Sequence, residues 1–159
     1  MKNYFTYLWT NARWKQKCES SNERSRLLSY AASENFRKRG VEPGSTVFIV
    51  TVLGGELYLG GSILVSKMMT HAEAKNFLDL PEQDLWRAED YIVAEKGKEM
   101  IMRCDNKIPA AIAHELRFWT SAGSVKPKVV DGELERQTLR GIRQLYPGSE
   151  KPLLSRAMA

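Results

Sequence analysis

The stretch TVFIVTVLGGELYLGGSILV, residues 46–65, places two apolar runs on either side of a Gly-Gly-Glu turn. It predicts a β-hairpin, because β-branched and aromatic residues favour strands and a glycine pair favours a tight turn. In the first run, from Val47 to Val52, both faces are apolar. Such a run is typical of a central strand that is covered on both sides.

A second glycine pair, Gly60-Gly61, interrupts the second strand, although a plain hairpin does not need it. Glycine inside a strand marks a bulge, a sharp bend or the close approach of another group. A central strand followed by a bent partner is what closure of a small barrel requires. We therefore expect a curved barrel; the alternative is an ordinary bent hairpin in an α+β sheet.

The rest of the chain completes an α+β prediction: a curved barrel of about five to six strands with flanking helices and a helical C-terminal extension. No linker or internal repeat is seen, so we expect one domain over 1–159, with a core at about 3–120 and the helical extension at about 121–159. The predicted elements besides the hairpin are a strand over 3–9, a helix over 21–39, a helix over 70–78, a second hairpin from 91–94 and 99–104, a helix beginning at Pro109 and a helix over 132–145.

Composition points to a folded chain with a mildly basic surface. Of the 159 residues, 43% are hydrophobic and 27% are charged, and the net charge is +5. A basic balance favours a polyanionic partner, although a solvated basic surface explains the charge equally well. No apolar run approaches the roughly 20 residues of a membrane span, so no membrane partner is expected. Cys18 and Cys104 follow a start that has no signal-peptide pattern, which predicts a cytoplasmic protein and favours free thiols over a disulfide, although a disulfide is possible.

No convincing catalytic set, cofactor motif or metal site emerges, so a binding module is favoured over an enzyme. His71 and His114 are the two histidines, and neither lies in a zinc-binding pattern. Walker, dinucleotide-binding and nucleophile-elbow motifs are missing from the sequence. The acidic loop 79–90 is the one cluster that could bind a metal, although a solvated loop is commoner; its members are Asp79, Glu82, Asp84, Glu89 and Asp90.

The aromatic residues are more informative. The chain has four tryptophans, and Trp86 lies in a charged loop between Asp84 and Arg87. A tryptophan in such a place either covers the core or lines a site where a flat or cationic ligand stacks. We expect Trp9, at the end of the first strand, to converge with Tyr30 and Trp86 on one pocket.

Residues 4–66 resemble the EVE domains of the PUA-like superfamily, which are related to YTH and ASCH domains. The resemblance rests on the order of short segments: aromatic first strand, helical segment, glycine turn, buried strand, glycine turn and a strand that curls round a barrel. These segments are Tyr4 to Trp9, Ser29-Tyr30-Ala31-Ala32, Asn35-Phe36-Arg37, Pro43-Gly44-Ser45, Val47 to Val52, Gly54-Gly55 and Tyr58 to Val65.

The resemblance implies a module that binds DNA or RNA and accepts a flipped, methylated or hydroxymethylated base in an aromatic pocket. Some relatives are fused to restriction nucleases, so a nuclease partner and a modification-dependent restriction system are implied as well. Trp9 and Trp86 would stack on the base, Tyr30 would stack or donate its hydroxyl, and Ser29 with the backbone near Leu53 would read the base edge. The expected phosphate contacts are Arg13, Lys15, Lys17, Arg37, Lys38 and Arg39.

Two other functions remain open. A small metal-dependent hydrolase or nuclease would use the acidic loop 79–90, around Asp84 and Asp90. A protein-interaction module would dock a partner on the C-terminal helical part, which would then expose an apolar patch.

Overall fold

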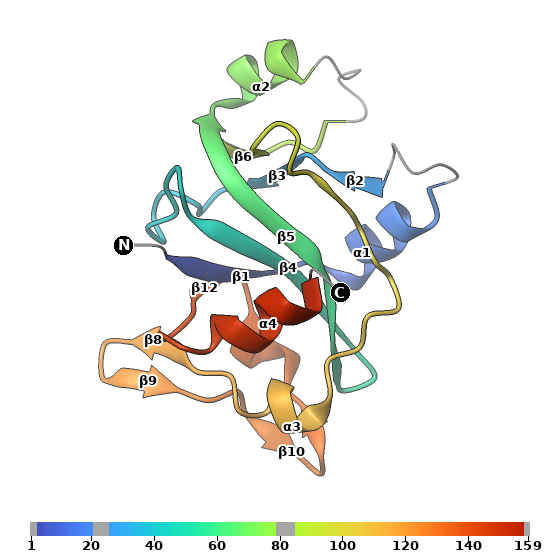
Figure 1. Cartoon of the computed structure of the whole chain (residues 1–159), viewed down its shortest axis with the longest axis vertical. Helices are drawn as coiled ribbons and strands as arrows, with labels where there is room; N and C mark the ends of the chain where they lie inside the picture. Colours follow the sequence, from blue (N-terminus) through green and yellow to red (C-terminus); the bar gives the residue numbers. More distant parts are fainter. Residues whose placement is uncertain (1–2, 21–25, 79–84, 158–159) are drawn as a thin grey trace.

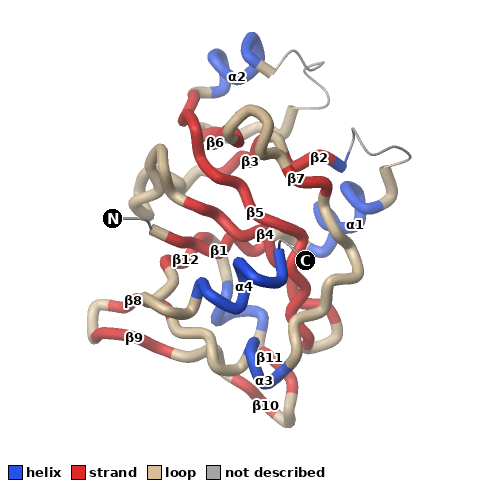
Figure 2. The backbone as a smooth tube through the Cα atoms, in the orientation of Figure 1, coloured by secondary structure: helices blue, strands red, loops and turns tan. Residues whose placement is uncertain are grey.

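The computed structural model describes residues 3–20, 26–78 and 85–157, and a curled six-stranded sheet is its main feature (Figure 1). The strand order is β12-β1-β4-β5-β6-β3. Strands β1 and β4 are parallel, and the other neighbours are antiparallel. The α+β class is confirmed, and the sheet curls into a half-barrel (Figure 2). The strands are β1 (Tyr4–Leu8), β3 (Tyr30–Ser33), β4 (Thr46–Leu53), β5 (Glu56–Met69), β6 (Asp90–Ala94) and β12 (Ile142–Gln144).

Short helices and strand pairs surround this sheet. The helices are α1 (Asn11–Cys18), α2 (His71–Phe77), α3 (Ala110–Ala113) and α4 (Glu150–Ala157), with a 3-10 helix at Arg136–Leu139. Three small ribbons are formed by β2 (Leu27–Leu28) with β7 (Met100–Ile101), β8 (Phe118–Thr120) with β9 (Gly123–Val125), and β10 (Val129–Val130) with β11 (Glu133–Leu134).

The long strand β5 bends the sheet. It pairs with β4 through its first part and with β6 through its last part (Figure 1). Ile49 pairs with Gly61 while Val50 pairs with Leu59, so Gly60 is the extra residue of a β-bulge. The predicted bend at the second glycine pair is therefore confirmed.

The second glycine pair also lets two side chains approach the backbone closely. A Cβ atom on Gly60 would lie 3.1 Å from the Trp14 ring, and one on Gly61 would lie 2.8 Å from the Leu28 side chain. Gly61 also has a φ of +154°, which side-chain-bearing residues rarely adopt. The hairpin thus bends around α1, which carries Trp14, and around β2, which carries Leu28.

Both faces of the sheet are covered, as the apolar character of β4 predicts. Val47 and Ile49 point into a core shared with Trp14 of α1. Phe48 and Val50 point the other way, into a core closed by α3, α4 and the C-terminal segments. A third cluster lies under α2 and includes Tyr30, Tyr91 and Leu85. Because successive side chains of β4 point to opposite faces of the sheet, this one strand contributes to both main cores.

The predicted helix over 21–39 is wrong where the structure describes it. Residues 21–25 lie outside the described part, Leu27–Leu28 and Tyr30–Ser33 are strands, and 36–40 form a turn. The helix in this region, α1, ends at Cys18, before the predicted range begins. Ala31 packs into one core and Ala32 into another, which is strand alternation. Pairing with β6 outweighs the helical preference of these alanines.

The C-terminal expectations also need correction. The predicted helix over 132–145 is instead β11, the 3-10 helix and β12, and β12 is the edge strand of the main sheet beside β1. The helix from Pro109 ends at Ala113, and Trp119 lies in β8. In place of the second hairpin, β6 pairs with β5 and β3, while β7 pairs with β2. The helix after Thr70 is confirmed, with its capping box.

The two cysteines are joined, so the expectation of free thiols is wrong. Cys18 at the end of α1 and Cys104 after β7 form a disulfide, with their Cα atoms 6.0 Å apart. Pairing of β2 with β7 brings the two segments together, and the backbone N–H of Met102 donates to the Arg26 carbonyl. Among the described residues, no helix is long and apolar enough to cross a lipid bilayer.

Candidate functional site

Three aromatic residues from three separate segments meet beside α1. The Trp9 and Trp86 rings lie 5.1 Å apart, edge to face, and the Tyr30 ring lies 6.1 Å from Trp86. Trp9 follows β1, Tyr30 begins β3, and Trp86 precedes β6. The structure thus brings the three side chains together, while the pocket that they were expected to line stays a prediction.

Trp9 forms the buried base of this aromatic cluster, with 1% of its surface exposed. Its backbone N–H donates to the Val50 carbonyl, and its carbonyl accepts from the Thr51 hydroxyl. Its indole Nε1 is buried and has no hydrogen-bond partner among the described residues. A buried donor without a partner is uncommon in folded proteins.

Arg13 covers the outer side of Trp86, which is only half-buried. The Arg13 guanidinium carbon lies 4.2 Å from the centre of the Trp86 ring, within the range of a cation–π contact. The same guanidinium donates to the Tyr7 hydroxyl at 3.1 Å, and that hydroxyl donates to the Ala32 carbonyl at 2.7 Å. Helix α1 presents Arg13 here because the Thr10 side chain caps its N-terminus.

Arg136 fixes the backbone below the aromatic cluster, and sequence reasoning missed it. Its guanidinium donates to the carbonyls of Trp9 and Val52 and to the Asn11 side chain, the last two at 2.8 and 2.7 Å. Burial lowers the pKa of Arg136 from its ordinary value, because desolvation disfavours the charged form. No local pattern marks this arginine, since all its partners are distant in sequence.

Tyr91 fixes the segment that carries Trp86. Its side chain is fully buried, and its hydroxyl donates to the Trp86 carbonyl and accepts from the Ala88 N–H at 3.3 Å. His71 Nδ1 lies 2.7 Å from the same hydroxyl. Burial raises the pKa of Tyr91, and the Ala88 hydrogen bond and the Arg87 charge partly oppose this rise. The sequence showed only a strand residue here.

The two residues predicted to read a base edge have different positions. Ser29 is half-buried directly before Tyr30, and its carbonyl accepts from the Ala94 N–H. Leu53 is half-buried at the far end of β4, beside the hairpin turn, and packs at the margin of the core that contains Trp14. Ser29 thus adjoins the aromatic cluster through Tyr30, whereas Leu53 borders the core that contains Trp9 from the hairpin end of β4.

Several of the basic residues predicted to contact phosphate already have protein partners. Lys17 donates to the Leu27 carbonyl at 3.1 Å, and burial lowers its pKa. Arg37 pairs with Asp90 at 3.4 Å, and Lys15 lies 4.0 Å from Glu19. The side chains of Lys38 and Arg39 are exposed in the turn that follows β3.

The acidic loop does not form a metal site in the part of it that is described. Asp79, Glu82 and Asp84 lie outside the described residues, Glu89 is exposed, and Asp90 binds Arg37. Across 3–20, 26–78 and 85–157, no three histidine, cysteine or carboxylate side chains are grouped so that they could hold a metal ion.

No family model, curated protein or solved structure matches this chain. The similarity of residues 4–66 to EVE domains therefore stays a prediction, and the function of the chain has to be inferred from the geometry of the aromatic cluster.

Proposed function

We propose that this chain is a nucleic-acid-binding module that holds a modified base against the aromatic cluster of Trp9, Tyr30 and Trp86. One observation carries the proposal: three aromatic rings converge with a buried, unpartnered indole N–H, and an arginine lies on the accessible ring. A flat, electron-poor ligand with an acceptor atom suits this combination. The EVE-like order of residues 4–66 agrees with this assignment except at Tyr30–Ser33, which is a strand where that order has a helical segment.

The base would take the place of the Arg13 guanidinium on Trp86. A guanidinium and a nucleobase are both flat, and both stack on the face of an indole. Trp9 Nε1 would donate a hydrogen bond to an acceptor on the base edge, and the displaced Arg13 would turn to the adjacent phosphate. Stacking on an aromatic side chain contributes about 1–3 kcal/mol per base.

A modified base fits this proposal better than an ordinary one. The base has to leave its stack, which costs a few kcal/mol, and the site must recover that loss. A methyl or hydroxymethyl group adds area that apolar rings remove from water, at about 25 cal/mol per Å². Exposed Lys38 and Arg39 would add sequence-independent attraction for phosphate.

The test compares oligonucleotides that differ only in one base: cytosine, 5-methylcytosine or 5-hydroxymethylcytosine, in DNA and in RNA. Fluorescence anisotropy should show tighter binding of a modified strand, and Trp86→Ala should abolish the difference while Trp86→Phe retains part of it. Phe77→Ala is the matched control, because Phe77 is an exposed aromatic residue on α2. Equal affinity of the wild type for all strands, at low and high salt, would refute the proposal.

The rival functions receive less support from the described residues. A metal-dependent hydrolase lacks its ligands there. The last helix buries Leu153 and Ala157 in the protein's own core, so it is not a free apolar docking surface. A nuclease partner and a cytoplasmic location remain predictions. The disulfide weighs against the cytoplasm, where thiols are kept reduced.

A further inference from the structure

Three flat side chains form a second group at the other end of β1. Arg117 and Trp119 lie two residues apart, and alternation along an extended segment puts them on the same side. The backbone N–H of Tyr146 donates to the Arg117 carbonyl at 2.8 Å, which sets Tyr146 opposite them. The Arg117 guanidinium lies 5.0 Å from the Tyr146 ring centre, and the Trp119 ring lies 4.7 Å from it.

The Trp119 ring is accessible to a ligand. Trp119 is 44% exposed, although an indole is among the largest apolar groups a protein can bury. Its neighbour Phe118 is fully buried, so the β8 strand itself is firmly packed. A rigid strand therefore presents an open indole face to solvent.

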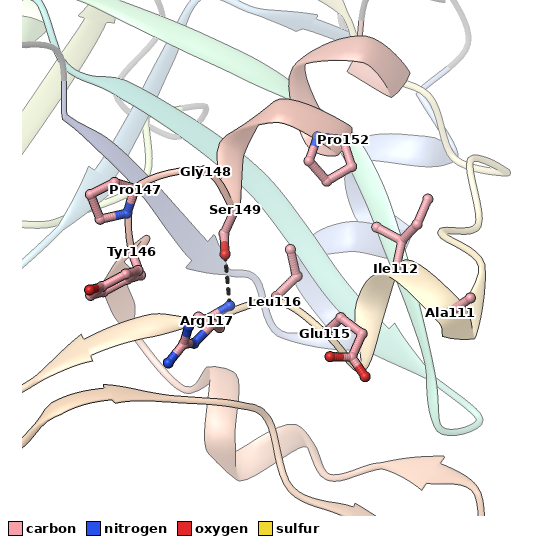
Figure 3. Close-up of a pocket in the computed structure, with 10 residues that line it drawn as sticks. All are labelled: Ala111, Ile112, Glu115, Leu116, Arg117, Tyr146, Pro147, Gly148, Ser149 and Pro152. Atoms are coloured by element: carbon pink, nitrogen blue, oxygen red, sulfur yellow. Dashed lines mark hydrogen bonds between the residues drawn. The ribbon is translucent and has the colours of Figure 1, made fainter.

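A pocket of about 410 Å³ adjoins this group (Figure 3). Arg117 and Tyr146 form one side of it, and Ile112, Leu116 and Pro152 contribute apolar surface. The Ser149 hydroxyl accepts from the Arg117 backbone N–H at 2.9 Å, which leaves its own proton able to face a ligand.

The charges around this pocket favour an anion. Glu115 also lines it, but Lys126 donates to the Glu115 carboxylate and so offsets its charge. Among the described residues, no carboxylate is ion-paired with Arg117. A cationic ligand would be repelled by Arg117, whereas a phosphate would be attracted.

We propose that Arg117, Trp119 and Tyr146 bind a nucleotide of an unmodified single strand, with a base on Trp119 and its phosphate on Arg117. The pocket would hold the phosphate and sugar beside Arg117, whereas Trp119, which does not line it, would carry the base outside it. An aromatic ring beside an arginine is the combination that single-strand-binding surfaces use. Lys128, exposed three residues after the end of β9, adds positive charge to this part of the chain.

This second site shares no residue with the aromatic cluster. The Leu145 N–H donates to the Tyr4 carbonyl, and Trp9 follows Tyr4 by five residues of extended chain. At about 3.3 Å per residue, the segment from Tyr4 to Trp9 that separates the two sites is roughly 16 Å long. Binding of a nucleotide at this second site therefore does not depend on binding of a modified base at the aromatic cluster.

The test measures binding of a fluorescent oligothymidylate of about 12 nucleotides, a length within the usual span of single-strand-binding domains. Trp119→Ala should weaken binding about 5- to 150-fold, and Trp119→Phe should restore part of the loss. Arg117→Gln should lower the slope of log affinity against log salt by about one. Phe77→Ala should bind as the wild type does, and melting curves should show that every variant is folded.

Unchanged affinity of Trp119→Ala would overturn the inference, as would an unchanged salt slope of Arg117→Gln. Failure of the wild type to bind oligothymidylate would also overturn it. So would the finding that Trp119 binds a protein and no nucleic acid. The preference for modified over unmodified strands separates the two proposals. Trp119→Ala should weaken the binding of both kinds of strand equally, whereas Trp86→Ala should remove the preference for the modified one.

Discussion

The guanidinium of Arg136 donates a hydrogen bond to the carbonyl of Trp9, although 127 residues separate them in the chain. The same group binds the Asn11 side chain at the start of α1 and the Val52 carbonyl near the end of β4. One side chain from the C-terminal third therefore fixes the backbone on both sides of the aromatic cluster. The C-terminal third is thus structurally tied to the candidate site.

We expect Arg136→Met to lower the free energy of unfolding by about 1–3 kcal/mol. The variant keeps much of the apolar stem but leaves the Trp9 and Val52 carbonyls without their charged donor, and unmade hydrogen bonds to buried groups cost about this much. Urea unfolding followed by tryptophan fluorescence measures the change. Arg140→Met is the control, because Arg140 is exposed near the same 3-10 helix. Equal stability of the two variants would contradict the assigned role.

Gly61 beside the bulge and Gly97 in a turn allow the effect of close approach to be separated from that of backbone strain. Gly61→Ala combines a positive φ with a contact of 2.8 Å to Leu28, whereas Gly97→Ala has a positive φ and open space around it. We expect Gly97→Ala to cost about 1 kcal/mol and Gly61→Ala clearly more, up to about 3 kcal/mol. Thermal melting checks the order. If both variants melt together, the packing of Leu28 against the bulge is unimportant.

The sequence predicted the central hairpin because its signals are local. Apolar β-branched runs, a glycine turn and a second glycine pair lie within residues 46–65, and each signal agrees with the final sheet. The capping box at Thr70 is equally local and equally well realised. Trp9, Tyr30 and Trp86 also converge, although the hypothesis placed Tyr30 on a helix and the structure places it at the start of β3.

Distant pairing explains the errors. Alanines 31 and 32 suit a helix in isolation, but β6 makes them a strand. Residues 142–144 look helical by spacing, but β1 needs an antiparallel edge partner. The Arg136 contacts and the disulfide depend on groups that meet only after folding. Propensity is a weak guide wherever tertiary contacts decide the local conformation.

Reduction of the Cys18–Cys104 disulfide should lower stability by about 4–5 kcal/mol. The bond closes a loop across 86 residues of sequence, and the loss of chain entropy in the unfolded state grows with loop length. Urea unfolding with and without a reductant measures it, and Cys18→Ser/Cys104→Ser should match the reduced protein. A reductant effect that persists in the double variant would show that the disulfide is not its cause.

Alkaline pH should weaken the wild type through Tyr91. Burial raises the pKa of Tyr91 above its ordinary value of 10.0, so the folded state holds the phenolic proton more tightly than the unfolded chain. This contribution is complete below pH 10 and is lost as the pH rises from 10 towards the folded-state pKa. Tyr91→Phe has no hydroxyl to titrate, so this residue causes no loss of stability at alkaline pH in the variant.

Unfolding measurements at pH 8 and above pH 10 test this difference. Near neutral pH, Tyr91→Phe should be less stable by about 1–3 kcal/mol, because the Trp86 carbonyl and the Ala88 N–H lose their buried partner. The gap should narrow as the pH rises above 10. Lys17, whose pKa is lowered by burial, is present in both proteins and cancels in the comparison. A gap that is constant with pH would mean that Tyr91 does not titrate on unfolding.

The last prediction concerns Arg13, whose guanidinium lies on the Trp86 ring. If the base displaces it and it then contacts phosphate, Arg13→Gln should lower the salt slope of binding by about one while the preference for a modified base remains. Stability should fall only slightly, because a cation–π contact at an accessible site contributes about 0.5–1 kcal/mol. Lys96→Gln, in the exposed turn after β6, controls for general charge. If Arg13→Gln instead loses the preference for a modified base and keeps the salt slope, Arg13 does not contact phosphate. Its role is then to support the Trp86 ring, with its own position fixed by the hydrogen bond to Tyr7.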